Sequence, residues 1–183
     1  KLELRLLADV GLLGKPNSGK SSLVNAVSSA NPKVADFEFT TLKPSLGVVD
    51  YITDKSFVIS DIPGLITGAS KGVGLGFQFL KHLSRTRVIL QIIDVGDKEI
   101  QEIEKESKEL IKELKEFDSN LIRKVKWLVL NKIDLISKEE QKKIKDHMTK
   151  SQDLNVDLIS AKQRLGTENL MKKIGFELEK FDE

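Results

Sequence analysis

The segment GKPNSGKS, residues 14–21, has the residue types and the spacing of a loop that binds phosphate groups. It fits the pattern G-x-x-x-x-G-K-[ST] and joins an apolar stretch to a segment of helical character. In such a loop the glycines let the backbone wrap, so that successive N–H groups point at phosphate oxygens. The Lys20 ammonium would reach the β- and γ-phosphates, and the Ser21 hydroxyl would ligate Mg²⁺. The predicted phosphate-binding residues are Gly14, Lys15, Pro16, Asn17, Ser18, Gly19, Lys20, Ser21 and Ser22.

A second polar segment, DIPG at residues 61–64, ends another apolar stretch. By itself an aspartate before Pro-Gly is usually only a turn. Downstream of a phosphate-binding loop, the Asp61 carboxylate is expected to hold Mg²⁺ through a water, and the Gly64 N–H can sense the γ-phosphate. Ile62 and Pro63 are included in the predicted nucleotide-binding segment.

A third segment, NKID at residues 131–134, follows an apolar stretch and indicates which base is bound. Guanine presents an N1–H and an exocyclic amine on one edge, and the Asp134 carboxylate can accept both hydrogen bonds. Adenine has no such pair of donors, so it would leave a desolvated charge unpaired. Asn131 would bond the far edge of the base and brace the phosphate loop, while the Ala161 N–H can donate to the guanine oxygen. The predicted base-binding residues are Asn131, Lys132 (through its stem), Ile133, Asp134, Ser160, Ala161 and Lys162.

Leu65 follows DIPG where many nucleotide hydrolases place a polar side chain that orients water. Leucine can neither orient nor deprotonate water, so we expect slow intrinsic hydrolysis. Fast turnover then needs positive charge or water alignment from elsewhere. One candidate is K⁺ bound beside the phosphates with the help of Asn17, and the other is a macromolecular partner. The sequence leaves both open.

The elements that must position these residues alternate between strand and helix. Strands are expected at 8–14, 45–51, 56–62, 87–95, 126–132 and 156–161, and helices at about 21–29, 76–86, 98–117, 137–150 and 167–181. Strands separated by helices of this length predict βαβ units in a mostly parallel sheet with helices on both faces. The fold class is therefore α/β, with six strands, of which the strand at 45–51 is expected to be antiparallel at one edge.

Length and composition favour a single domain over residues 1–183. The net charge is only +2, so no polybasic field recruits nucleic acid or a membrane by itself. The chain has no cysteine, which excludes disulfides and thiolate metal sites, and no apolar run approaches the roughly 18 residues of a membrane span. We expect a cytoplasmic monomer. Because the chain begins with Lys1 close to a strand, we also expect it to be part of a longer protein.

The chain resembles translation-factor-type GTPase domains and, more narrowly, the Obg family of bacterial ribosome-associated GTPases. The resemblance runs from about Leu2 to Phe181 and rests on ADVGLLGKPNSGKSSLVNAVSSA, FEFTTLKPSLGVV, DIPGLITGASKGVGLGFQFLKHLSRTR and NKIDL. It implies a first switch at Phe39–Lys43, in which Phe39 and Thr40 approach the nucleotide and Thr41 closes on Mg²⁺. Thr40 is the alternative ligand.

The resemblance further implies a second switch from Asp61 to about Phe77 and a glycine-rich amino-terminal and a variable carboxy-terminal domain that this chain lacks. The partner it implies is the large ribosomal subunit, through roles in its assembly and in stress or growth control. Thr67, Phe77 and Ser45 depart from the family pattern, which bears on partner contacts and water positioning rather than on nucleotide binding.

Together these features predict a P-loop GTPase that hydrolyses GTP slowly and acts as a molecular switch. Lys20, Thr41 and Gly64 are expected to act in hydrolysis, with Ser21, Thr41 and (through water) Asp61 at the metal. The alternative is a sensor of GTP, GDP or guanosine tetraphosphate that acts by occupancy. An ATP-dependent kinase is disfavoured by Asp134. Structural or surface roles are expected for His82, His147, Trp127, Arg85 and Arg87.

Overall fold

The computed structural model describes residues 8–34, 43–61 and 80–182. These residues form a seven-stranded sheet in the order β2-β3-β4-β1-β5-β6-β7. All neighbouring pairs are parallel except those of β3 with β2 and with β4. The strands are β1 Val10–Leu13, β2 Lys33–Val34, β3 Ser45–Ile52, β4 Lys55–Asp61, β5 Val88–Asp94, β6 Val125–Asn131 and β7 Asn155–Ile159.

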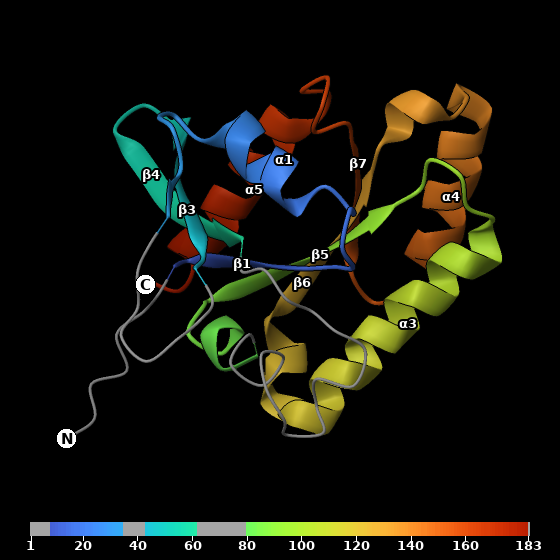
Figure 1. The fold of residues 1–183 in the computed structure, drawn as a ribbon, viewed down its shortest axis with the longest axis horizontal. Coiled ribbons are helices and arrows are strands. Elements are labelled where there is room, and N and C mark those ends of the chain that lie inside the picture. The colour runs from blue at the N-terminus through green and yellow to red at the C-terminus, as the bar shows by residue number, and fades with distance from the viewer. Residues whose placement is uncertain (1–7, 35–42, 62–79, 183) are drawn as a thin grey trace.

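Helices cover both faces of this sheet (Figure 1). Helices α1 and α5 pack on one face, and α3, α4 and the helical residues 80–83 pack on the other. Two helices begin at a capping box, Glu99 with Glu102 before α3 and Ser137 with Glu140 before α4. The bounds are α1 Lys20–Val27, α3 Ile100–Phe117, α4 Lys138–Ser151 and α5 Thr167–Glu179, with 3-10 turns η2 Ser119–Lys124 and η3 Ile133–Leu135.

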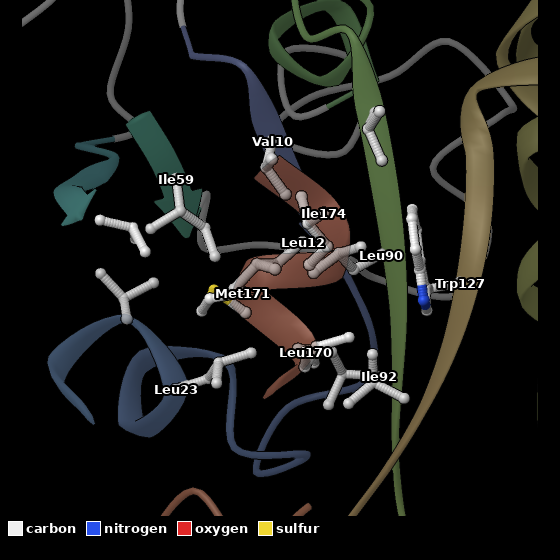
Figure 2. Close-up of a cluster of buried hydrophobic side chains, with 14 of the residues drawn as sticks. Val10, Leu12, Leu23, Ile59, Leu90, Ile92, Trp127, Leu170, Met171 and Ile174 are labelled. Atoms are coloured by element: carbon white, nitrogen blue, oxygen red, sulfur yellow. The ribbon is translucent and has the colours of Figure 1, made fainter. Parts of the chain in front are cut away.

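Each face of the sheet has its own apolar core. Figure 2 shows the core beneath α1 and α5, where Leu23 of α1 and Met171 of α5 meet strand residues such as Leu12 and Leu90. The interior strand β5 is buried along Val88–Ile93, as expected for a parallel strand covered on both faces. The loops of the site leave from the ends of these packed strands.

The predicted α/β architecture is confirmed, with one more strand than expected. Strand β2 has two residues, too few to show any periodicity, and it pairs antiparallel with β3 through Lys33 opposite Leu46. Strand β3 is antiparallel as predicted but lies one position inside the edge. The predicted helix at 76–86 falls partly outside the described residues, and its described part is helical at 80–83.

The carboxyl ends of the five parallel strands β4, β1, β5, β6 and β7 meet at one edge of the sheet, where open α/β sheets bind ligands. Each of the predicted nucleotide-binding segments within the described residues begins there. These strands end at Leu13, Asp61, Asp94, Asn131 and Ile159.

Candidate functional site

The loop between β1 and α1 is folded around the Lys20 side chain. Lys20 is buried, and its Nζ donates to the carbonyl oxygens of Gly14 at 2.8 Å and Lys15 at 3.0 Å. Burial lowers the pKa of the Lys20 ammonium, while the negative charge of Asp61 opposes that shift. The ammonium is thus held inside the loop among neutral carbonyls, in the position where phosphate oxygens would supply its missing counter-charge.

Two residues of this loop have backbone conformations in the left-handed region, Asn17 at φ 64° and Gly19 at φ 97°. Glycine is required at 19 for a second reason, because a Cβ there would lie 2.1 Å from Asn131 Nδ2. A Cβ at Gly14 would lie 2.5 Å from the carbonyl oxygen of Ile92. The loop therefore packs directly against β5 and β6, and its shape depends on both glycines.

Ser21 and Asp61 come together from different elements. The Ser21 hydroxyl, in the first turn of α1, donates to Asp61 Oδ2 at the end of β4 over 2.5 Å. Asp61 is 5 % exposed, and its Oδ1 is buried without a hydrogen-bond partner among the described residues. A hydroxyl beside a carboxylate with a free oxygen fits Mg²⁺, which prefers hard oxygen ligands and keeps several waters. Of the other predicted metal and phosphate residues, Phe39, Thr40, Thr41, Ile62, Pro63 and Gly64 lie outside the described residues, as does Leu65.

Asn131 joins the phosphate loop to the loop after β7. Its Nδ2 donates to the Ser18 carbonyl oxygen at 2.9 Å, and its Oδ1 accepts from the Ala161 N–H at 3.0 Å. The side chain is 1 % exposed, so both bonds are shielded from water. The Ala161 N–H, assigned from the sequence to the guanine oxygen, is thus used by Asn131 in this structure.

A pocket of about 580 Å³ opens between α1 and the loops after β6 and β7. This volume lies within the range of small-molecule sites. Asp134 lines it, and Asp134 Oδ1 is buried without a hydrogen-bond partner among the described residues. A buried acceptor of this kind is what a base with two adjacent N–H donors would satisfy. The lining comprises Gly19, Ser22, Asn25, Ala26, Asn131, Lys132, Asp134, Leu135, Ala161, Lys162 and Arg164.

Several of these lining residues escaped the sequence reasoning, namely Asn25, Ala26, Leu135 and Arg164. Leu135 is 59 % exposed although it is a large apolar residue, and it directly follows NKID, which is the signal that could have identified it. Arg164 has φ 57° in the turn that closes the loop between Ser160 and Leu165. Only the folded loop brings Arg164 to the pocket, so its sequence position gave no signal.

Two carboxylates near the connection between β5 and α3 were also missed. Asp94, the last residue of β5, accepts from Lys132 Nζ at 2.5 Å and from the Gly96 N–H at 2.8 Å. Glu106 of α3 accepts from Lys98 Nζ at 2.7 Å and lies 3.7 Å from Lys15 Nζ in the phosphate loop. Each of the two loops that would hold the nucleotide therefore has a lysine paired with a carboxylate from this region.

The residues assigned to structural or surface roles lie away from the pocket. Trp127 Nε1 donates to Asp157 Oδ2 at 3.1 Å inside the core, and His147 Nε2 pairs with Glu104 on the surface at 2.7 Å. Arg87 donates to Asp182 at 2.6 Å near the end of the chain.

In the described ranges, no group of three or more histidine or acidic side chains is arranged to hold a metal ion, and no helix is long and apolar enough to cross a membrane.

The comparisons with solved structures agree with this fold. The G domain of the FeoB iron transporter from T. maritima superposes with a TM-score of 0.69 at 24 % identity, over 93 % of this chain and 97 % of that one. A putative nucleolar GTP-binding protein 1 from Plasmodium falciparum gives a TM-score of 0.63 at 26 % identity, over 94 % of this chain and 86 % of that one. A point variant of Aquifex aeolicus Era, bound to GDP·AlF₄⁻, gives 0.68 at 25 % identity over 91 % of this chain, which spans 55 % of the Era chain.

A match to a protein family covers most of the site. Residues 9–132 match the family described as 50S ribosome-binding GTPase. This range includes the phosphate loop, Asp61 and the first two residues of NKID. These findings support a G-domain GTPase and do not distinguish the Obg family within that class. The chain is a GTP-binding G domain with a P-loop, and it belongs to the family of 50S ribosome-binding GTPases.

Proposed function

We propose that this domain binds GTP with Mg²⁺ and hydrolyses it slowly, as a molecular switch. One observation carries the proposal: at the carboxyl edge of the sheet, the buried oxygens Asp61 Oδ1 and Asp134 Oδ1 each lack a hydrogen-bond partner among the described residues. The first lies beside the Ser21 hydroxyl, where a metal would bind, and the second lines the pocket. Mg²⁺ and guanine are the groups whose chemistry satisfies these two oxygens.

In this proposal each charged group has a separate task. Lys20 binds the phosphates and stabilises the charge that develops as the terminal phosphoryl group is transferred to water. Ser21 and, through a water, Asp61 would hold Mg²⁺, which would neutralise phosphate charge. Asp134 accepts from the guanine edge, and Asn131 keeps the phosphate loop in register with the base-binding loops through its bond to Ser18.

Slow hydrolysis follows because Leu65 cannot align water, so a further group must complete the site. We propose K⁺ as one such group, with Asn17 among its ligands. Asn17 lies in the phosphate loop, where it is exposed and has φ 64°. We propose the large ribosomal subunit as the macromolecular partner, and the description of the matching family supports this. The finer assignment to the Obg family rests on the sequence motifs.

Single-turnover hydrolysis of GTP tests the proposal. The domain, with Mg²⁺, is mixed with GTP in K⁺ or in Na⁺, each with and without purified 50S subunits. We expect a slow basal rate that is raised at least about tenfold by K⁺, by the subunits or by both, since mutational losses of comparable charge stabilisation are about 10²-fold. Asn17→Ala should abolish the K⁺ response.

If the domain binds GTP but hydrolyses it in none of these four conditions, the switch mechanism is overturned. A sensor that acts by occupancy is then favoured. Stimulation by the subunits alone would remove K⁺ from the proposal. It would keep the partner as the source of the missing catalytic group.

A further inference from the structure

Asp94 accepts hydrogen bonds with both carboxylate oxygens, one from the loop after β6 and one from within the β5–α3 connection. Its Oδ2 accepts from Lys132 Nζ at 2.5 Å, and its Oδ1 accepts from the Gly96 N–H at 2.8 Å. In the sheet, Asp94 is the register partner of Asn131, the residue immediately before Lys132. The pairing of β5 with β6 therefore places this carboxylate beside the base-binding loop.

A second carboxylate, Asp134, lies on the same pocket as Lys132. Lys132 and Asp134 both line the pocket, and Asp134 Oδ1 is buried without a hydrogen-bond partner among the described residues. A lysine ammonium on its flexible stem is attracted by a nearby carboxylate, the more strongly where water is excluded. If Lys132 turned to Asp134, the ammonium would occupy the acceptor that the guanine edge needs.

In this structure the Lys132 ammonium is paired with Asp94 instead. The Lys132 backbone has φ 68°, and its ammonium pairs with Asp94. Lys132 lines the pocket, whereas the carboxylate that neutralises its charge does not. Asp94 Oδ1 also accepts from the Gly96 N–H, and Gly96 packs against Leu135, which lines the pocket. A Cβ at Gly96 would lie only 2.6 Å from Leu135 Cδ1.

We propose that Asp94 is a specificity-determining positioning residue, which holds the Lys132 ammonium so that the Asp134 carboxylate stays available to guanine. This rests on the proposed role of Asp134 as the reader of the base. Asp94 is not among the residues that line the pocket. It acts through Lys132.

Comparison of GDP with IDP gives a readout that separates this role from a general loss of structure. Hypoxanthine keeps the N1–H of guanine and lacks its exocyclic amine, so the preference for GDP reports the acceptor strength of Asp134. In Asp94→Asn the amide oxygen can still accept from Gly96, but the charge that holds Lys132 is lost. We expect the Kd for GDP to rise about tenfold and the preference for GDP over IDP to fall about threefold or more.

A double-mutant cycle tests the route through Lys132. In the Lys132→Met background no ammonium competes for Asp134, so adding Asp94→Asn should change the Kd for GDP by less than about twofold. Asp97→Asn is the matched control, since it removes the same charge from an exposed residue of the same connection. It should leave both the Kd and the preference unchanged.

Each outcome is decisive. Equal weakening of GDP and IDP binding by Asp94→Asn, or the same loss with and without Lys132, would overturn the proposal and leave Asp94 a structural residue. If the wild type itself does not prefer GDP over IDP or ADP, the base-reading role of Asp134 fails. The proposal for Asp94 fails separately, if the wild type prefers GDP and Asp94→Asn keeps that preference.

Discussion

Asn131 shows how one side chain can determine the geometry of several loops. Its amide donates to Ser18 in the phosphate loop and accepts from Ala161 after β7, and Gly19 passes so close that a Cβ there would meet Asn131 Nδ2 at 2.1 Å. Three segments far apart in the sequence therefore share one buried amide. At this scale the site is preorganised by hydrogen bonds that water cannot replace.

Replacement of Asn131 by alanine would leave the Ser18 carbonyl and the Ala161 N–H without their partners. We expect Asn131→Ala to lower the free energy of unfolding by about 2–4 kcal/mol, because two buried hydrogen bonds are lost. The Kd for GDP should rise as well, since the phosphate loop loses its brace. Asn155→Ala is the control, because Asn155 is exposed and its side chain makes one hydrogen bond among the described residues, to the Lys126 carbonyl at 3.2 Å. A similar loss of stability in both variants, measured by urea unfolding, would contradict the assignment.

At the scale of elements, α5 is fixed to β3 and β4 by Tyr51. The Tyr51 ring packs so closely on α5 that a Cβ at Gly175 would lie 2.2 Å from Tyr51 Cδ2. The Tyr51 hydroxyl donates to Glu179 at 2.7 Å, and Lys55 donates to the same carboxylate at 2.6 Å. This arrangement lies at the far end of α5 from the nucleotide-binding edge, so it affects stability rather than binding.

The Tyr51 contact predicts a specific pH dependence. Burial, followed by the hydrogen bond to Glu179, raises the pKa of Tyr51 from 10.0 to about 12. Folding thus favours the protonated phenol, and its contribution to stability is complete below about pH 10 and is lost as the pH rises through 12. Urea unfolding of the wild type and Tyr51→Phe between about pH 8 and 12 should show the stability difference shrinking over that window. A difference that stays constant up to the highest pH would contradict this.

The fold was predictable from the sequence because its signals are local, whereas the rest of the site depends on pairing across the sheet. Apolar runs such as 87–95 and capping residues such as Ser137 determine where strands and helices form. Strand β2 was missed because two residues carry no periodicity. Asp94 was missed because only the β5–β6 register places it beside Lys132. Local motifs identify residues that bind a ligand directly, but not those that act through them.

At the scale of the whole molecule, five strands end at one edge of the sheet, and an apolar core packs on each face behind that edge. In the proposed function, the phosphates, the metal and the base would each be bound at the end of a different strand. The charged residues follow the same plan, because Asp94 and Glu106 each pair with a lysine of a different loop. The central claim is that Asp134 makes this edge specific for guanine.

The binding of GDP, XDP and ADP to the wild type and to Asp134→Asn tests this claim most directly. In the variant, an amide N–H faces the base, which suits the 2-oxo group of xanthine and not the amine of guanine. We predict that the wild type prefers GDP by at least about 100-fold over both others and that the variant reverses the order of GDP and XDP. Retention of the GDP preference by Asp134→Asn, with the protein still folded, would contradict the account.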